Sequence, residues 1–143
     1  MKFLDTSALL ISTDKILLDR NAIFSFLSAS YWAYNRPREI IEKSIENSLC
    51  FGLYYDSNQI GFARVVTDFS VFAYLADVFV KEEFRGKGAG KKMLETILNY
   101  PELKDVKKWM LATKDAHTLY EKFGFTALKD PKKYMEYISL KLT

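Results

Sequence analysis

The 143-residue chain has little of what several common classes of protein require. It has one cysteine (Cys50) and one histidine (His117), so it can form neither an internal disulfide nor a cysteine–histidine zinc site. No apolar run approaches the ~20 residues of a membrane-spanning helix. The net charge of +3 is far from the dense basic stripe typical of nucleic-acid-binding proteins. We therefore expect no metal, nucleic-acid or membrane partner.

The remaining composition is typical of a folded chain, with 49% hydrophobic, 27% charged and 15% aromatic residues. A chain of this length buries roughly two thirds of the surface of its unfolded form, so a core forms without disulfides. There is no internal repeat and no Pro/Gly/Ser-rich linker, which predicts a single domain over 1–143. Asp5 lies where a signal peptide would be uncharged. We expect a soluble cytoplasmic protein, either a monomer or a homodimer.

Hydrophobic periodicity predicts alternating strands and helices. The predicted strands are 15–19, 50–55, 60–66, 71–80, 109–112 and 137–142. The predicted helices are 21–27, a helix beginning at Pro37, 88–100 and 116–123. The order β-α-α-β-β-β-α-β-α-β indicates an α/β (α+β) fold, with a mixed, mostly antiparallel central sheet and helices on both faces.

A glycine-rich segment, Arg85-Gly86-Lys87-Gly88-Ala89-Gly90-Lys91, joins the strand that ends at Val80 to the next helix. Glycines allow close backbone approach, and the unpaired N–H groups of a helix N-terminus favour phosphate. A solvated, lysine-rich turn is the alternative. The P-loop pattern fails because Lys92 follows Gly90-Lys91, and the dinucleotide-binding pattern fails because residue 91 is lysine.

Two segments, residues 78–90 and then residues 116–125, resemble in this order the two signatures of the GNAT acyltransferase superfamily. Residues 78–90, VFVKEEFRGKGAG, resemble its acetyl-CoA signature, [QR]-x-x-G-x-[GA] after a hydrophobic strand. Residues 116–125, AHTLYEKFGF, resemble its second signature, A-x-x-L-Y-x-x-x-G-F. The resemblance covers most of the chain, least well residues 1–12 and the last strand, and implies the GNAT fold.

The resemblance also implies an N-acetyltransferase with acetyl-CoA as co-substrate and no metal. Tyr120 matches the family's general acid, although its place on an apolar helix stripe equally suits a core tyrosine. Thr113 stands where the family often has a cofactor-binding asparagine, and His117 occupies a variable, exposed position. The cofactor would contact the main chain of Val78, Phe79 and Val80 and the N–H groups of Arg85, Gly86, Lys87, Gly88, Ala89, Gly90 and Lys91.

The base and the acceptor are less well defined. Asp77 interrupts an apolar strand, so it is either a base facing a cleft or a structural partner of a backbone N–H or of an arginine such as Arg64. Asp68 is the second candidate base, although its turn position favours capping. Three aromatic residues, Tyr31, Trp32 and Tyr34, lie in a loop that the resemblance places at the edge of the acceptor site, where they would either contact a substrate or fill the core. We expect a small amine acceptor; the alternatives are a protein acceptor and a non-catalytic CoA-binding module.

Overall fold

The computed structural model describes residues 4–139, which fall into two compact units. The first unit ends at Ala112, and the second begins at Thr113. Among residues 4–139, no helix is long and apolar enough to cross a membrane.

The first unit is built on one sheet of five strands in the spatial order β1-β2-β3-β4-β5. Neighbouring strands from β1 to β4 pair antiparallel, and β5 pairs parallel with β4. The sheet is therefore mixed and mostly antiparallel, as the sequence predicts. The strands are β1 (Leu10–Ser12), β2 (Leu49–Tyr55), β3 (Asn58–Thr67), β4 (Phe72–Val80) and β5 (Lys108–Leu111).

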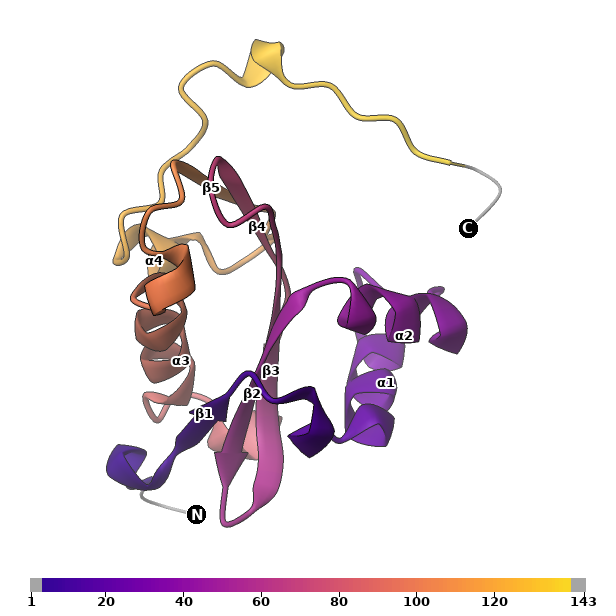
Figure 1. The fold of residues 1–143 in the computed structure, drawn as a ribbon, viewed down its shortest axis with the longest axis vertical. Helices are drawn as coiled ribbons and strands as arrows, with labels where there is room; N and C mark the ends of the chain where they lie inside the picture. The colour runs from indigo at the N-terminus through magenta and orange to yellow at the C-terminus, as the bar shows by residue number, and fades with distance from the viewer. Residues whose placement is uncertain (1–3, 140–143) are drawn as a thin grey trace. The chain divides into compact units, whose positions relative to one another are not determined.

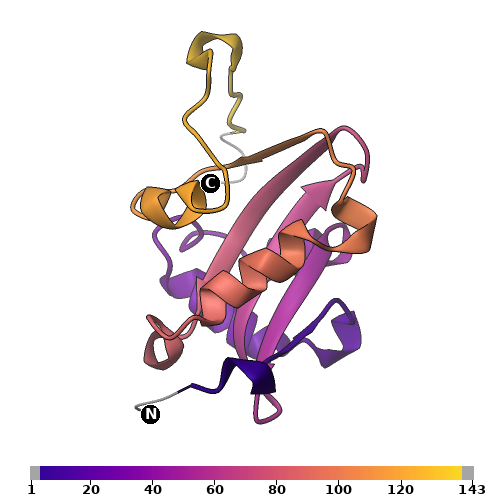
Figure 2. The same ribbon diagram turned by 90° about the vertical axis from the view of Figure 1, so that its left-hand side faces the viewer.

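Helices cover both faces of this sheet, as expected. Helices α1 (Arg20–Ala29) and α2 (Arg38–Glu46) lie on one face and α3 (Ala89–Leu98) on the other (Figure 1). Figure 2 shows α3 crossing the strands diagonally. Because α3 connects β4 to β5, it forms the crossover that a parallel strand pair requires.

The helices sit where apolar residues three and four positions apart form one face. Helix α1 has Ile23 and Leu27 on this face, and α2 has Ile41 and Ile45, each pair separated by four positions. All four side chains are at most 1% exposed. They pack in one core cluster with residues of the sheet, including Phe62 and Phe79. Fully burying an Ile or Leu side chain contributes about 1.5–3 kcal/mol. The helices are thus held mainly by the sheet.

Two predicted strands need correction. Residues 15–19 form no strand: the Asp14 carboxylate accepts from the Ile16 N–H and starts a 3₁₀ helix over Lys15–Leu17. The first strand is β1 instead, five residues earlier at its start, paired through Leu10↔Tyr54. For the predicted last strand, residues 137–139 form no strand, and 140–142 lie outside the described residues.

The second unit contains one short α-helix, α4 (His117–Glu121), among its described residues. Gly124 adopts φ +95°, which a left-handed residue after a helix end requires. A 3₁₀ helix follows at Pro131–Lys133. The predicted helix over 116–123 is therefore confirmed, with a shorter regular part.

Candidate functional site

Strand β4 is irregular near its centre. Phe62 pairs with Phe79 and Arg64 with Ala76, so one residue of β3 faces two residues of β4, Asp77 and Val78. Such an extra residue is a β-bulge, which bends a strand and redirects its side chains. Asp77 has φ +54°, a conformation that costs a non-glycine residue about 1 kcal/mol or more.

Beyond the bulge, one side of β4 has an open edge. The register with β5 ends at Leu75↔Leu111, whereas β4 continues to Val80. Among the described residues, no strand pairs with the end of β4 on that side. The Lys81 N–H donates to the Ile60 carbonyl at 2.7 Å, so the alternation of an antiparallel ladder directs the main-chain groups of Val80 toward the open edge.

The three residues predicted to contact the cofactor through their main chains are therefore not equivalent. Val78 and Val80 face the open edge, and Phe79, paired with Phe62, directs its groups toward β3. The Val80 carbonyl already accepts a hydrogen bond from Arg85 Nε at 2.8 Å. Val78 and the Val80 N–H are thus the main-chain groups best placed for a ligand.

The glycine loop leads from this edge into α3. Gly86 and Gly88 have φ +72° and +89°, values that glycine adopts without strain. Gly88 is the N-cap of α3, and no side chain caps this helix. By contrast, the Asp19 carboxylate caps α1 by accepting from the Ala22 N–H at 3.0 Å. The first turn of α3 therefore offers main-chain donors that its own sequence leaves without a side-chain acceptor.

The basic side chains of this loop bond main-chain carbonyls. In addition to Arg85, Lys87 Nζ donates to the Glu83 carbonyl at 3.3 Å, and Lys92 Nζ to the Thr6 carbonyl at 2.6 Å. Lys91 is exposed. No salt bridge joins these four cations to an acidic side chain among residues 4–139. The cations at the start of α3 are therefore not held in ion pairs with carboxylates of this part of the chain.

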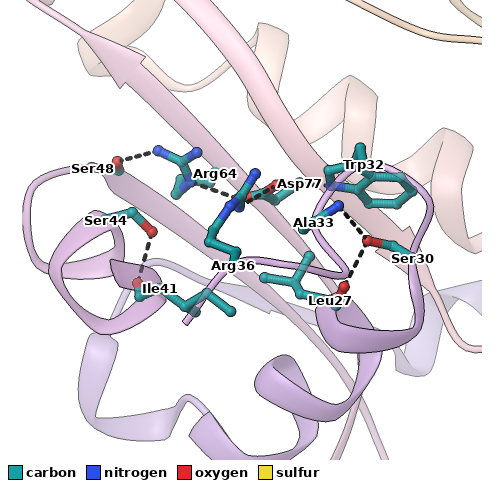
Figure 3. A network of polar contacts seen from close by, with 10 residues as sticks. All are labelled: Leu27, Ser30, Trp32, Ala33, Arg36, Ile41, Ser44, Ser48, Arg64 and Asp77. Carbon is teal, nitrogen blue, oxygen red and sulfur yellow. Dashed lines mark hydrogen bonds and ion pairs between the residues drawn. The ribbon is translucent and has the colours of Figure 1, made fainter. Parts of the chain in front are cut away.

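Asp77 lies in a cluster of polar contacts on the face that carries α1 and α2 (Figure 3). Its carboxylate accepts from Trp32 Nε1 at 2.9 Å and from Arg64 Nε at 2.8 Å. Arg36 Nη1 donates to both carboxylate oxygens, at 3.1 and 3.0 Å. Arg64 Nη1 also donates to Ser48 Oγ at 3.1 Å. We call these five residues, Trp32, Arg36, Ser48, Arg64 and Asp77, the Asp77 cluster.

The surroundings of Asp77 make it a weak base. Its side chain is 2% exposed, and burial alone would raise the pKa of the carboxyl. Arg64 and Arg36, together with the hydrogen bonds from Arg64 and Trp32, outweigh burial and hold the pKa below its ordinary value. This geometry favours the structural alternative, in which Asp77 is the partner of Arg64.

Asp68, the second candidate base, caps the turn between β3 and β4. Its carboxylate accepts from the N–H groups of Ser70, Val71 and Phe72 at 3.0, 2.8 and 3.1 Å. These backbone hydrogen bonds, led by that of Phe72, lower the pKa of Asp68. All three donors lie in the turn that Asp68 begins or at its junction with β4, so the geometry favours the capping role of this carboxylate.

The three aromatic residues of the loop after α1 are at the surface. Tyr31, Trp32 and Tyr34 are 54%, 39% and 64% exposed, so they do not fill the core. The Tyr31 and Trp32 rings meet edge to face, with their centroids 5.2 Å apart. Through Trp32 this loop connects to Asp77, so the structure brings a predicted acceptor-site residue and the first candidate base together.

The remaining candidates lie in the second unit. Tyr120 is on α4 and is 8% exposed, and its ring meets that of Phe125 edge to face at 5.9 Å. The Thr113 hydroxyl accepts from the Ala116 N–H at 3.1 Å. Thr113 thus shapes the chain just before α4, and the exposed His117 begins that helix.

Arg36 and Ser48 were not predicted as site residues. Arg36 lies in a loop and Ser48 directly before a strand, positions where polar residues are ordinary. The signal available in the sequence was Arg64, a cation within the apolar strand predicted at 60–66, where a charge requires a partner nearby. Asp77 in the neighbouring apolar strand was the matching signal.

Comparison with known proteins identifies the family. Residues 46–127, more than half of the chain, match the protein family described as "Acetyltransferase (GNAT) domain". A candidate acetyltransferase of Gibberella zeae is 33% identical over 137 residues, covering 79% of this chain and 76% of that protein. The chain belongs to the GNAT acetyltransferase family.

Solved structures agree with this GNAT assignment. The structure of a candidate GNAT-family acetyltransferase from Xanthomonas campestris pv. campestris has a TM-score of 0.89 and 41% identity, covering 92% of this chain and 93% of that one. A GNAT acetyltransferase from Elizabethkingia anophelis, solved with acetyl-CoA bound, has a TM-score of 0.65 and 19% identity, covering 92% and 88%. At 19% identity the second likeness shows the shared fold.

Proposed function

We propose that this GNAT protein transfers the acetyl group of acetyl-CoA to the primary amine of a small molecule, by direct attack within a ternary complex. The observation that carries the proposal is the start of α3. A helix without a side-chain cap begins there, after two glycines with positive φ, directly beyond the open edge of β4.

The pyrophosphate of acetyl-CoA fits the start of α3. Unpaired N–H groups and the positive end of the helix dipole stabilise phosphate oxygens. Arg85, Lys87 and Lys91 add positive charge, and Gly86 and Gly88 let the backbone approach the ligand. The bound acetyl-CoA in the Elizabethkingia anophelis protein supports this choice of ligand. We assign the pyrophosphate to the main-chain N–H groups of residues 85–91.

The pantetheine arm extends along the open edge of β4. It carries amide groups, which pair with strand main chain as a further strand does. Val78 and the Val80 N–H face that edge. We assign the pantetheine amides to these two residues, with Thr113 as a further cofactor contact from the second unit.

The reaction removes two protons from the attacking nitrogen, one before and one after the attack, and supplies one proton to the leaving thiolate. The amine nitrogen attacks the thioester carbonyl, a C–N bond forms, and the C–S bond breaks. An alkyl ammonium has a pKa near 10, so it must lose a proton before attack. Because the donors around Asp77 make it a weak base, we assign this proton to solvent water. Tyr120 gives its hydroxyl proton to the departing CoA thiolate, and the second proton, which leaves the nitrogen after the attack, restores the neutral tyrosine.

Replacing Tyr120 by Phe tests the acid. We expect kcat to fall about 10- to 100-fold, because a positioned general acid contributes about that much or more. Acetyl-CoA affinity, measured by calorimetry, should stay within about twofold. The control is Tyr137→Phe in the same unit, where the side chain is 94% exposed. An unchanged kcat in the Tyr120 variant would remove this residue from the mechanism.

Two measurements test the proposed function together. Calorimetry with acetyl-CoA should show binding, and a thiol-release assay with a panel of small amines should show amine-dependent production of CoA. Binding without release for any small amine or peptide would favour the non-catalytic module. Release with peptides alone would favour a protein acceptor. Absence of acetyl-CoA binding would overturn the proposal.

A further inference from the structure

The Asp77 cluster carries more positive charge than it neutralises. Arg36 and Arg64 both form ion pairs with the Asp77 carboxylate, at 3.0 and 2.8 Å. Two guanidinium charges against one carboxylate leave one positive charge. The three side chains are 25%, 14% and 2% exposed, so this charge is partly withdrawn from water. An anion is the partner that would balance it.

The unused donors of Arg36 have the geometry that an anion requires. Arg36 bonds Asp77 through Nη1 alone. Its Nε and Nη2 make no hydrogen bond or ion pair with any residue between 4 and 139. These two N–H groups lie on the same edge of the planar guanidinium and donate in parallel, the arrangement that binds a carboxylate or phosphate with two hydrogen bonds.

These donors belong to a partly exposed side chain. Among the described residues, the one side-chain polar atom that is both buried and without a partner is the Tyr54 hydroxyl. The free nitrogens of Arg36 are therefore not fully buried, and the side chain as a whole is 25% exposed. The exposed rings of Tyr31 and Tyr34 belong to the same loop, and Trp32 bonds the same carboxylate as Arg36.

The cluster also sits where an acceptor must approach. Asp77 is the bulged residue of β4, held at φ +54°, and Val78 follows it at the open edge. If the thioester lies along that edge, as the proposed function requires, an amine reaching it passes the cluster. Strained, over-determined residues of this kind are concentrated at functional sites.

We propose that the acceptor is an amine that also carries an anionic group, a carboxylate or a phosphate, and that Arg36 binds this group through its Nε and Nη2 edge. This inference rests on the proposed function for the transfer itself, but anion binding by Arg36 is measurable without any turnover. A polycationic amine would meet the surplus charge and be disfavoured.

Matched pairs of amines test the proposal by ligand-observed NMR titration. The first pair is 4-(aminomethyl)benzoate and its carboxamide; the second is O-phosphoethanolamine and ethanolamine. Each pair keeps the amine and changes the anionic group. We expect at least one anionic member to bind the wild-type protein about tenfold or more tightly than its neutral partner, the factor typical of a charge-assisted hydrogen bond. The member that binds identifies the carboxylate or the phosphate as the anion.

Arg36→Gln is the informative variant because it removes the surplus charge and leaves Asp77 bonded to Arg64 and Trp32. We expect the preference for the anionic member to fall to within about twofold. Arg36→Lys should retain part of it, since the charge remains and the two-pronged edge is lost. Arg38→Gln is the control, because Arg38 bonds Asn21 and Glu42 outside the cluster, and it should retain the full preference. Thermal melts check that each variant folds.

The proposal would be overturned by equal binding of the two members in both pairs, by no binding of any of them to the wild type, or by a preference that survives in Arg36→Gln. Should that variant fail to fold, full retention of the preference in Arg36→Lys would likewise contradict it. The proposed function fails separately, through absence of acetyl-CoA binding or CoA release, while anion binding by Arg36 is still measured.

Discussion

The first unit has two positively charged regions, and they use their hydrogen-bond donors in opposite ways. At the start of α3 the donors are main-chain N–H groups, and no side-chain carboxylate caps them. In the Asp77 cluster the donors are side chains, and a buried carboxylate already accepts four hydrogen bonds from them. The first region is thus suited to a large polyanion from solvent. The second supplies its own anion and retains one free arginine edge.

The same contrast separates the two helix starts. Helix α1 begins with Asp19, which fills a donor of the first turn, whereas α3 begins with Gly88, which has no side chain to do so. A capped start stabilises its own helix. An uncapped one leaves that stabilisation for a ligand to supply. A carboxylate introduced at the start of α3 should therefore occupy the main-chain donors itself and leave fewer of them for a ligand.

The largest expected effect comes from Gly88→Glu. It places a carboxylate beside the N–H groups proposed for the pyrophosphate and adds a side chain at φ +89°. We expect the Kd for acetyl-CoA to rise about 100-fold or more, from charge repulsion and loss of donors, a change of about 2.7 kcal/mol. Calorimetry measures it.

Gly88→Ala separates charge from backbone strain in this test. A Cβ at residue 88 would meet Thr6 Cγ2 at 3.5 Å, an ordinary contact, so the alanine variant adds backbone strain alone. We expect a much smaller loss of affinity than for Gly88→Glu. Equal losses in the two variants would show that the conformation of the loop, and not its charge, controls binding.

Asp77→Asn should lower the free energy of unfolding by about 3 kcal/mol, because removing one partner of a buried ion pair leaves its arginines without a balancing charge. Urea unfolding at pH 7 measures the loss. The control is Asp105→Asn, an exposed residue for which we expect a change within about 0.5 kcal/mol. A loss of similar size in both variants would mean that the cluster contributes no specific stabilisation.

The contribution of Asp77 should also depend on pH. Its pKa is lower in the folded protein than in the unfolded chain, where an aspartate titrates near about 3.9. The stabilisation is therefore fully present above that value and is lost as pH falls through the folded pKa. Unfolding of the wild type and of Asp77→Asn at a series of pH values should give curves that converge below about pH 4. A constant difference down to pH 2 would contradict the assignment.

The smallest expected effect is at the capped helix. Asp19→Ala removes the acceptor for the Ala22 N–H and should destabilise the protein by about 1 kcal/mol, with acetyl-CoA affinity unchanged. Urea unfolding and calorimetry together check both parts. A change in acetyl-CoA affinity would show that the two helix starts are not independent.

Most of the fold could be predicted because periodicity reports which face of an element is buried. The runs that became β2, β3 and β4 and the stripes of α1, α2 and α3 are long enough to show their period. The prediction of a strand at 15–19 was wrong because it rested only on the apolar composition of Ile16, Leu17 and Leu18. A local hydrogen bond from the Ile16 N–H to Asp14 decides the conformation instead.

The candidate site was predictable only in part. The glycine loop is a continuous segment, so its chemistry can be read along the chain. The Asp77 cluster joins residues far apart in sequence, since Arg36 and Asp77 are 41 positions apart. The positive φ of Asp77 depends on the register between β3 and β4, which no short sequence pattern specifies. The sequence therefore left Asp77 as either a base or a structural partner, and the structure shows which side chains it bonds.

A crystal structure of the protein with acetyl-CoA tests the central claim most directly. We expect pyrophosphate oxygens within about 3.2 Å of main-chain nitrogens at the start of α3, and pantetheine along the open edge of β4 at Val78 and Val80. Acetyl-CoA bound elsewhere, with the first turn of α3 free of phosphate, would contradict it.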